Sequence, residues 1–180
     1  MKKFTLLLII LFCFTATGCG LTLRKASALP TELHKVYFST EKPYSLLSVQ
    51  LKELLRSMNV HLLKPTSGAR FSIVISSDIF SHSLPDLVDT TLPTTINFSQ
   101  SATISIEDNL HHTTIASQSF TTTQSITLNT NQIYTINANS LIHQQLTHEM
   151  ISFIYYWLIS TNIKDTLHHA TRNQAARRAS

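Results

Sequence analysis

The sequence predicts one compact domain that combines helices and strands. Apolar residues recur at helical spacing over positions 44–58 and 140–159, and between these stretches several segments alternate between apolar and polar residues, as strands do. The 180-residue chain is 43% hydrophobic and 13% charged, which suits a domain with a real core. No glycine follows Gly68, so a Gly-rich phosphate-binding loop is excluded there and a nucleotide enzyme is not expected.

Residues 1–18 have the pattern of a signal peptide. Lys2 and Lys3 precede an apolar run, Phe4–Phe14, that is too short for a permanent membrane span. Small residues then lead to Cys19, as at the cleavage site of a bacterial lipoprotein. We predict cleavage before Cys19 and acylation of its thiol, so Cys19 is the expected lipid-attachment residue. In the alternative interpretation, Cys19 is only a small apolar residue at the end of the signal.

Charge is segregated along the chain. Residues 24–70 carry eight Lys or Arg and three Glu, whereas residues 71–163 carry six carboxylates and no Lys or Arg. The net charge of +4 therefore does not describe a basic face for nucleic acid, and no nucleic-acid partner is expected. The basic residues Lys52, Arg56, Lys64 and Arg70 indicate the solvated face of a helix and its exit loop, with an anion site as the alternative.

The first half of the domain is expected to contain a helix between two short strands. Val36–Ser39 is the first strand candidate, and Pro43 precedes a helix from about Tyr44 to Met58. Its apolar stripe consists of Leu47, Leu51, Leu54, Leu55 and Met58. Val60–Leu63 is the next strand candidate, before a loop at Pro65–Gly68.

Three longer strands are expected next. In Phe71–Ile79 the odd positions apart from Ser77 are apolar, and Ile96–Ile106 alternates with Gln100 as the one polar residue on the apolar side. Asp108-Asn109 supplies a turn before the strand Thr113–Leu128, in which the odd positions from 117 to 127 are all Ser or Thr. This polar face is either an ordinary exposed surface or an uncharged surface that enters a hydrated protein cavity, where fixed charges would cost desolvation.

Asn139 is a candidate cap for a second helix, Ser140 to about Ile159. Its second half, Met150–Ile159, is apolar almost all round and is expected to be buried, the alternative being an aromatic surface that docks on a partner. We predict a basic disordered tail for residues 164–180. The domain boundaries are therefore 1–18, 19–163 and 164–180.

No catalytic or metal site is predicted. His148-Glu149 resembles the start of a zinc-protease helix, but Ser152 occupies the position of the second ligand, so no metal or other cofactor is expected. A Gly-x-Ser-x-Gly nucleophile motif is excluded by the missing glycines. The carboxylates Asp78, Asp86, Asp89, Glu107 and Asp108 are interpreted as solvated loop charges, although the sequence leaves a glycosidase pair open.

Several segments resemble the lipopolysaccharide-assembly lipoprotein LptE (RlpB) family. Cys19–Arg24 is similar to the family's Cys-Gly-Phe-x-Leu-Arg opening, and Leu29-Pro30, the Leu47–Met58 helix and the strand at Asn59–Leu63 follow in the family's order. The resemblance covers most of the chain after residue 18 and ends in the long helix.

This resemblance implies an α+β fold, with two helices packed on one face of a mixed, roughly four-stranded β-sheet. It further implies a non-enzymatic outer-membrane lipoprotein that faces the periplasm. Such a protein plugs and helps assemble the LptD β-barrel, binds lipopolysaccharide and aids its insertion into the outer leaflet. Gly20, rather than an inner-membrane retention Asp, favours this location.

The lipopolysaccharide-binding residues are not assigned. Gln118 and Thr121 stand where the family's basic residues are expected, and Lys25 follows Arg24 where the family often has Gly. Either the lipid is bound elsewhere or this chain serves mainly as the plug. The rival hypothesis is a pilot or lipid-carrier lipoprotein with the same anchor and a different outer-membrane client.

Overall fold

The computed structural model describes residues 29–64, 68–83, 94–128 and 136–178, so the predicted signal peptide and Cys19 lie outside the described residues. The elements, in chain order, are η2 Thr31–His34, β1 Lys35–Thr40, α2 Leu46–Ser57, β2 His61–Leu63, β3 Phe71–Ser83, β4 Thr94–Asp108, β5 Thr113–Leu128, α3 Ile136–Leu158 and α4 Thr161–Arg178.

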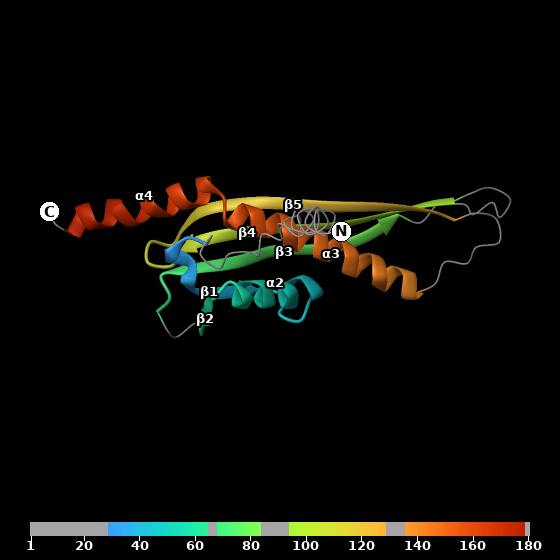
Figure 1. Cartoon of the computed structure of the whole chain (residues 1–180), viewed down its shortest axis with the longest axis horizontal. Helices are drawn as coiled ribbons and strands as arrows, with labels where there is room; N and C mark the ends of the chain where they lie inside the picture. Colours follow the sequence, from blue (N-terminus) through green and yellow to red (C-terminus); the bar gives the residue numbers. More distant parts are fainter. Residues whose placement is uncertain (1–28, 65–67, 84–93, 129–135, 179–180) are drawn as a thin grey trace, which may run out of the picture.

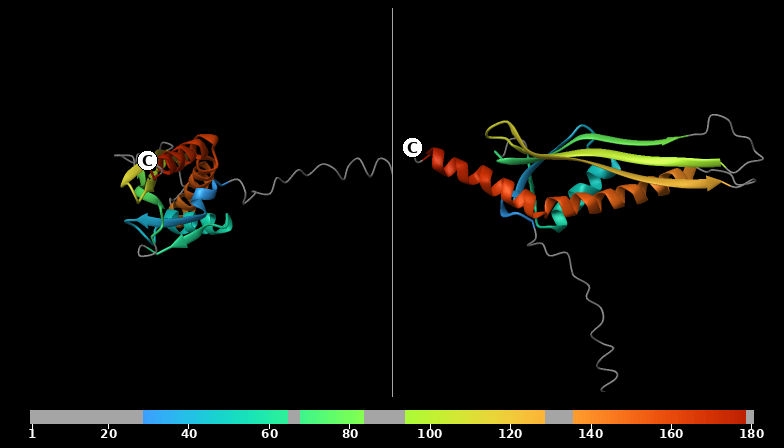
Figure 2. Two further views of the ribbon diagram at one scale, coloured as in Figure 1. Left: turned by 90° about the vertical axis from the view of Figure 1, so that its left-hand side faces the viewer. Right: turned by 90° about the horizontal axis from the view of Figure 1, so that it is seen from above.

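The strands form one mixed five-stranded sheet in the order β2-β1-β3-β4-β5. β1 pairs in parallel with β2 and β3, whereas β3, β4 and β5 form a long antiparallel meander. The helices lie on one side of this sheet, and no described element covers its opposite face (Figures 1 and 2). The predicted α+β architecture is therefore confirmed, with five strands rather than four.

Helix α2 begins two residues later than predicted because Ser45 caps it. The Ser45 hydroxyl oxygen accepts a hydrogen bond from the backbone N–H of Ser48 at 3.2 Å, which satisfies one of the free donors of the first turn. The helix ends at Ser57, and two residues later Asn59 adopts a left-handed φ of 60°, a conformation that asparagine tolerates. The apolar stripe is buried as expected, with Leu47, Leu51 and Leu55 fully inaccessible.

The main core lies between this helical layer and the sheet. Met150 and Ile154 of α3 and Ile104 and Ile106 of β4 are completely buried in one cluster. The apolar half of α3 is thus largely internal, as expected, although Phe153 is 44% and Tyr156 65% exposed. None of the helices within the described ranges combines the length and the apolar content that crossing a membrane requires.

The C-terminal tail is a helix, contrary to the predicted disorder from residue 164. Helix α4 runs to Arg178, and Ile163 and Leu167 are buried in the main core. Two polar contacts also hold it: His168 Nδ1 lies 3.0 Å from Glu32 Oε1, and an Arg70 Nη2 donates to the backbone carbonyl of Ala170 at 3.4 Å. The polar composition of residues 164–180 predicts no such packing, which depends on Ile163 and Leu167, two apolar residues four positions apart.

One local prediction was also wrong: helix α3 begins at Ile136, so Asn139 lies inside its first turn rather than at the cap. The predicted turn after Asp108 is present between β4 and β5, and its left-handed residue is His112, with φ 54°. Asn109 is held by its side chain, whose Nδ2 donates to the Ala69 carbonyl at 2.8 Å.

Replacing Leu167 tests the docking of α4. Leu167→Ala should lower the free energy of unfolding by about 2–4 kcal/mol, because a fully buried leucine leaves a cavity. The exposed neighbour His169→Ala should change it by less than about 0.5 kcal/mol. Urea denaturation measures both values, and equal midpoints for the two variants would contradict a docked helix.

Candidate functional site

The open face of the sheet is an array of uncharged hydroxyl side chains. We call it the hydroxyl face and define it by the outward-pointing residues of three strands. They are Ser77, Ile79, Ser81 and Ser83 on β3, the odd positions from Thr95 to Ser105 on β4, and the odd positions from Ser117 to Thr127 on β5. All of them except Ile79 and Asn97 are Ser or Thr, and none is charged.

Cross-strand hydrogen bonds order these hydroxyls. Thr103 pairs with Ser119 at 2.9 Å between the hydroxyl oxygens, and Thr95 pairs with Thr127 at 3.1 Å. The Ser125 hydroxyl donates to Asn97 Oδ1 at 2.6 Å. Because a hydroxyl can both donate and accept, the same groups can also pair with any polar partner or with water.

The contribution of β3 to this face departs from the predicted alternation. The odd positions of β3 were expected to be apolar through Ile79, but the register with β4 shifts between Ile75 and Ser77. Such a bulge moves every later side chain to the other face. Ile79 is therefore 57% exposed, and Ser81 and Ser83 join the hydroxyl face. The available signal was that three of the four odd positions after Ile75, namely 77, 81 and 83, are serines.

A buried polar layer lies behind the hydroxyl face. Gln100, predicted as the one polar residue on the apolar side of β4, is completely buried, and its Oε1 accepts a hydrogen bond from the Thr147 hydroxyl at 2.8 Å. Thr122, opposite Gln100 on β5, donates to the carbonyl of Leu146 at 3.2 Å. These contacts fix α3 on the sheet and separate the main core from a smaller cluster around Phe98 and Ile142.

The described carboxylates of the predicted set, Asp78, Glu107 and Asp108, do not come together as a pair. Asp86 and Asp89 lie outside the described residues. Glu107 and Asp108 are adjacent on β4 and so point to opposite faces. Asp78 is opposite Ala102, six residues or about 20 Å along β4 from Asp108.

Asp108 has a structural role at the end of the β4–β5 hairpin. Its Oδ1 accepts from the backbone N–H of Leu110 at 2.9 Å, and its Oδ2 lies 3.1 Å from His111 Nδ1 and 3.5 Å from Arg70. Burial by itself raises the pKa of Asp108, but the His111 and Leu110 hydrogen bonds and the Arg70 charge outweigh it and bring the pKa below its usual value. The carboxylate therefore stays ionised and ties the hairpin to Arg70.

The predicted basic residues do not gather into an anion site. Lys52 Nζ sits 5.2 Å from the Phe38 ring centroid and donates to the Pro43 carbonyl at 3.4 Å, while Arg56 and Lys64 are exposed. Arg70 pairs with Asp108 and stacks on Phe71 at 4.6 Å. The interpretation as a solvated helix face fits Arg56 and Lys64, whereas Arg70 is part of the α4 contact.

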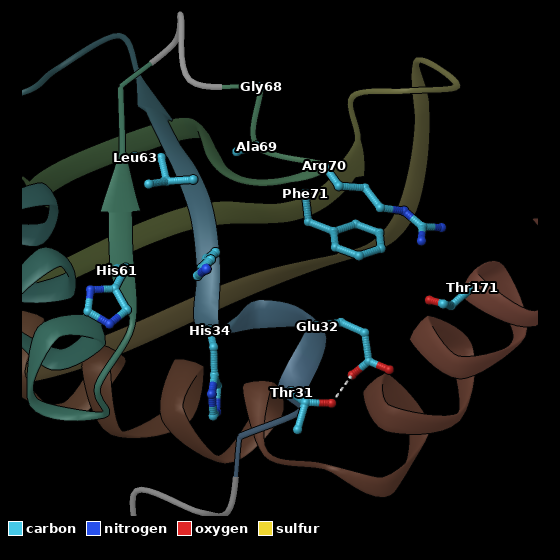
Figure 3. Close-up of a pocket in the computed structure, with 11 residues that line it drawn as sticks. Thr31, Glu32, His34, His61, Leu63, Gly68, Ala69, Arg70, Phe71 and Thr171 are labelled. Carbon is cyan, nitrogen blue, oxygen red and sulfur yellow. Dashed lines mark hydrogen bonds between the residues drawn. The ribbon is translucent and has the colours of Figure 1, made fainter.

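A cavity of about 990 Å³ opens beside Arg70, between η2, the start of β3 and α4 (Figure 3). Its lining includes Glu32, His34, His61, Arg70, Phe71 and Thr171. The Glu32 carboxylate accepts from the Thr31 hydroxyl at 3.2 Å and also pairs with His168. Glu32 and Arg70, two charged side chains that line the cavity, thus hold α4 against the sheet.

The histidines are dispersed. Within the described ranges, no three His, Cys, Asp or Glu side chains come close enough to hold a metal ion. His148 and Glu149 are both exposed. His143 instead stacks on Phe80, with 4.2 Å between ring centroids, and its burial lowers its pKa, while the Asp78 charge acts in the opposite direction.

No protein-family model and no curated protein sequence matches the chain. Solved structures of similar outline include three lipoproteins. A minor lipoprotein from Acinetobacter baumannii is 18% identical, with 81% of this chain and 93% of that one covered and a TM-score of 0.46. The rare lipoprotein B from Shewanella oneidensis is 12% identical, with 80% of this chain and 98% of that one covered and a TM-score of 0.46. An uncharacterized lipoprotein B from Nitrosomonas europaea is 16% identical, with 90% of this chain and 94% of that one covered and a TM-score of 0.48.

The lowered pKa of His143 predicts a pH dependence of stability. The folded chain favours neutral His143. The contribution of this group to the free energy of unfolding is therefore fully present above the ordinary histidine pKa of 6.5, and it is lost as the pH falls through that value and then through the lowered pKa. His143→Phe, which keeps a ring against Phe80 and cannot titrate, should flatten the dependence measured by urea denaturation between pH 7.5 and about 5. His169→Gln is the exposed control, and a His143→Phe curve parallel to wild type would contradict the prediction.

Proposed function

We propose that this chain is a Cys19-anchored outer-membrane lipoprotein that plugs a large β-barrel of the LptD type, helps it to assemble and aids lipopolysaccharide transport to the outer leaflet. The observation that carries the proposal is the hydroxyl face, a wide surface without any charged side chain. The opening of the sequence, Cys19–Arg24, and its resemblance to the LptE family support the anchor and the partner.

The chemistry of the hydroxyl face fits a barrel lumen. The interior of such a barrel is polar and wet, so an apolar surface would be poorly matched there, and a charged surface would lose hydration when it met the wall. Hydroxyls lose less hydration than charges and exchange water for polar wall groups at little net cost. The helical layer covers only the opposite face of the sheet (Figure 2), so the array is free to meet the wall.

The same arrangement argues for a structural role over catalysis. In the described part of the chain, Asp78 and Asp108 are far apart along the sheet and Asp108 is engaged with Arg70 and His111. The lipopolysaccharide-contacting residues stay unassigned. The alternative, a pilot or lipid-carrier lipoprotein, shares the anchor and differs in its client.

Pull-down of the lipidated chain from detergent-solubilised outer membranes, followed by mass spectrometry, tests the function directly. The expected result is stoichiometric recovery of a large β-barrel of the LptD type. Recovery of a secretin instead would support the pilot alternative, and recovery of no stable partner would overturn the plug.

The anchor is tested by Cys19→Ser. This variant should retain its first eighteen residues and incorporate no radiolabelled palmitate, because the thiol that is acylated is missing. The wild-type chain, labelled in parallel, should shift to the processed size. Palmitate labelling that persists in Cys19→Ser would overturn the anchor assignment.

The role of the hydroxyl face is tested by adding charge to it. Thr121→Lys or Thr123→Lys should reduce recovery of the barrel at least severalfold, because the ammonium must be desolvated against the wall. The melting temperature should hardly change, since both sites are exposed. Gln145→Lys adds the same charge to an exposed position of α3 and should leave recovery intact. Equal recovery for all three variants would count against the face as a contact surface.

A further inference from the structure

Strand β5 forms an edge of the sheet without the usual protection. The opposite edge, β2, has only three residues, whereas β5 has sixteen. Exposed edges are normally blunted by Lys, Pro, inward charges or short length, because their free N–H and C=O groups can pair with another strand. Thr113–Leu128 contains no charged residue and no Pro or Gly.

Exposure agrees with the strand order in showing that no other described strand lies beyond β5. Ser99, Ser101 and Thr103 of β4 are only partly exposed, although they belong to the hydroxyl face. Their partners on β5, among them Ser119 and Thr121, are exposed. The side chains are chemically alike, so the difference reflects the strand that β4 has beyond it and β5 lacks. Figure 1 shows β5 at the border of the sheet.

Helix α3 adds an apolar border to this edge. Trp157 packs edge-on against Phe120 of β5, with ring centroids 5.9 Å apart, so this flank of α3 faces β5. Phe153, four residues earlier, lies on the same flank and is 44% exposed, and the nearby Tyr156 is 65% exposed. An occupant of the edge would therefore cover aromatic surface as well as backbone groups.

We propose that the β5 edge is a self-association site, at which β5 of a second copy pairs antiparallel with it about a two-fold axis at Thr121. This register pairs residues 114–128 of each strand with their counterparts, nearly the whole edge. It places hydroxyl opposite hydroxyl, Ser119 against Thr123 and Ser117 against Ser125, as already seen between Ser101 and Thr121 at 3.3 Å. No like charges meet across the axis.

The inner-facing residues match in the same register. Gln118 of one copy comes opposite Gln124 of the other, and Gln124 Oε1 is buried without a hydrogen-bond partner within the described chain. The exposed amide of Gln118 donates one N–H to the Ser119 carbonyl at 3.2 Å and keeps its second N–H for the partner strand. An isologous contact needs only such self-complementarity, whereas the uncharged strand has nothing with which to select a charged peptide.

The dimer and the barrel complex are separate claims. The self-association proposal rests on the edge and on the α3 flank, and it concerns the chain before a barrel is present. Loss of one does not entail loss of the other, because the dimer is measured on the purified chain and the plug by co-purification.

Disulfide trapping tests the register. In the full-length Thr121→Cys chain, the new thiols should meet at the axis, where opposed Cβ atoms are about 4.5–5.5 Å apart, and form a dimer on mild oxidation. Ser101→Cys is the matched control, since it lies opposite Thr121 on the same face but one strand inward. The unsubstituted chain, oxidised in parallel, is the control for cross-links that form through Cys13 and Cys19. Equal trapping at residues 101 and 121 would overturn the edge assignment.

Sedimentation equilibrium tests the association without a cross-link. The purified chain should reach the dimer mass as concentration rises, and Phe153→Ser should raise the dissociation constant about tenfold or more, the effect expected of an anchoring aromatic residue. Leu141→Ser, exposed on the same helix but three turns away, should leave it unchanged. A monomer at all concentrations, or pairing of β5 only with a segment of another protein, would overturn the proposal.

Discussion

The two-sided character of strand β4 is the constraint on which the rest of the structure depends. Its even positions bury Phe98, Ile104 and Ile106, and its odd positions carry the hydroxyls that meet solvent. A shift of one residue would place the apolar set in water and the hydroxyls in the core. Because only one face of the sheet is apolar, the helices cover that face alone, and a wide polar surface is left uncovered.

Under the proposed function, the molecule meets its partner through this surface. Three ionisable side chains tie elements together: Asp108 and Arg70 join the hairpin to α4, and Glu32 joins η2 to His168. The two proposals use different parts of one strand. In the first proposal the outward side chains of β5 would meet a barrel wall, and in the second its backbone edge would pair with a second copy.

The sequence pattern predicted burial correctly where burial follows the period of a helix or strand. It failed where burial depends on contacts with distant residues. The α2 stripe and the alternation of β4 were predictable because each repeats over several turns or residue pairs. Thr147 donates to Gln100 Oε1 and the Leu146 carbonyl accepts from Thr122, and these partners of the two buried polar residues lie more than twenty residues away. The bulge after Ile75 and the docking of α4 through Leu167 likewise depend on contacts between distant segments.

The sequence by itself determined the class of elements, the two-faced strands and the absence of Lys and Arg from residues 71–163, because these follow from local composition and period. Tertiary structure decided which hydroxyls share one face, since that required the strand order and the change of phase at the bulge. It also decided that β5, rather than β4, lies at the edge and that a polar tail becomes a packed helix. Strand order and docking arise from the free energy of contacts between remote residues, which no local pattern records.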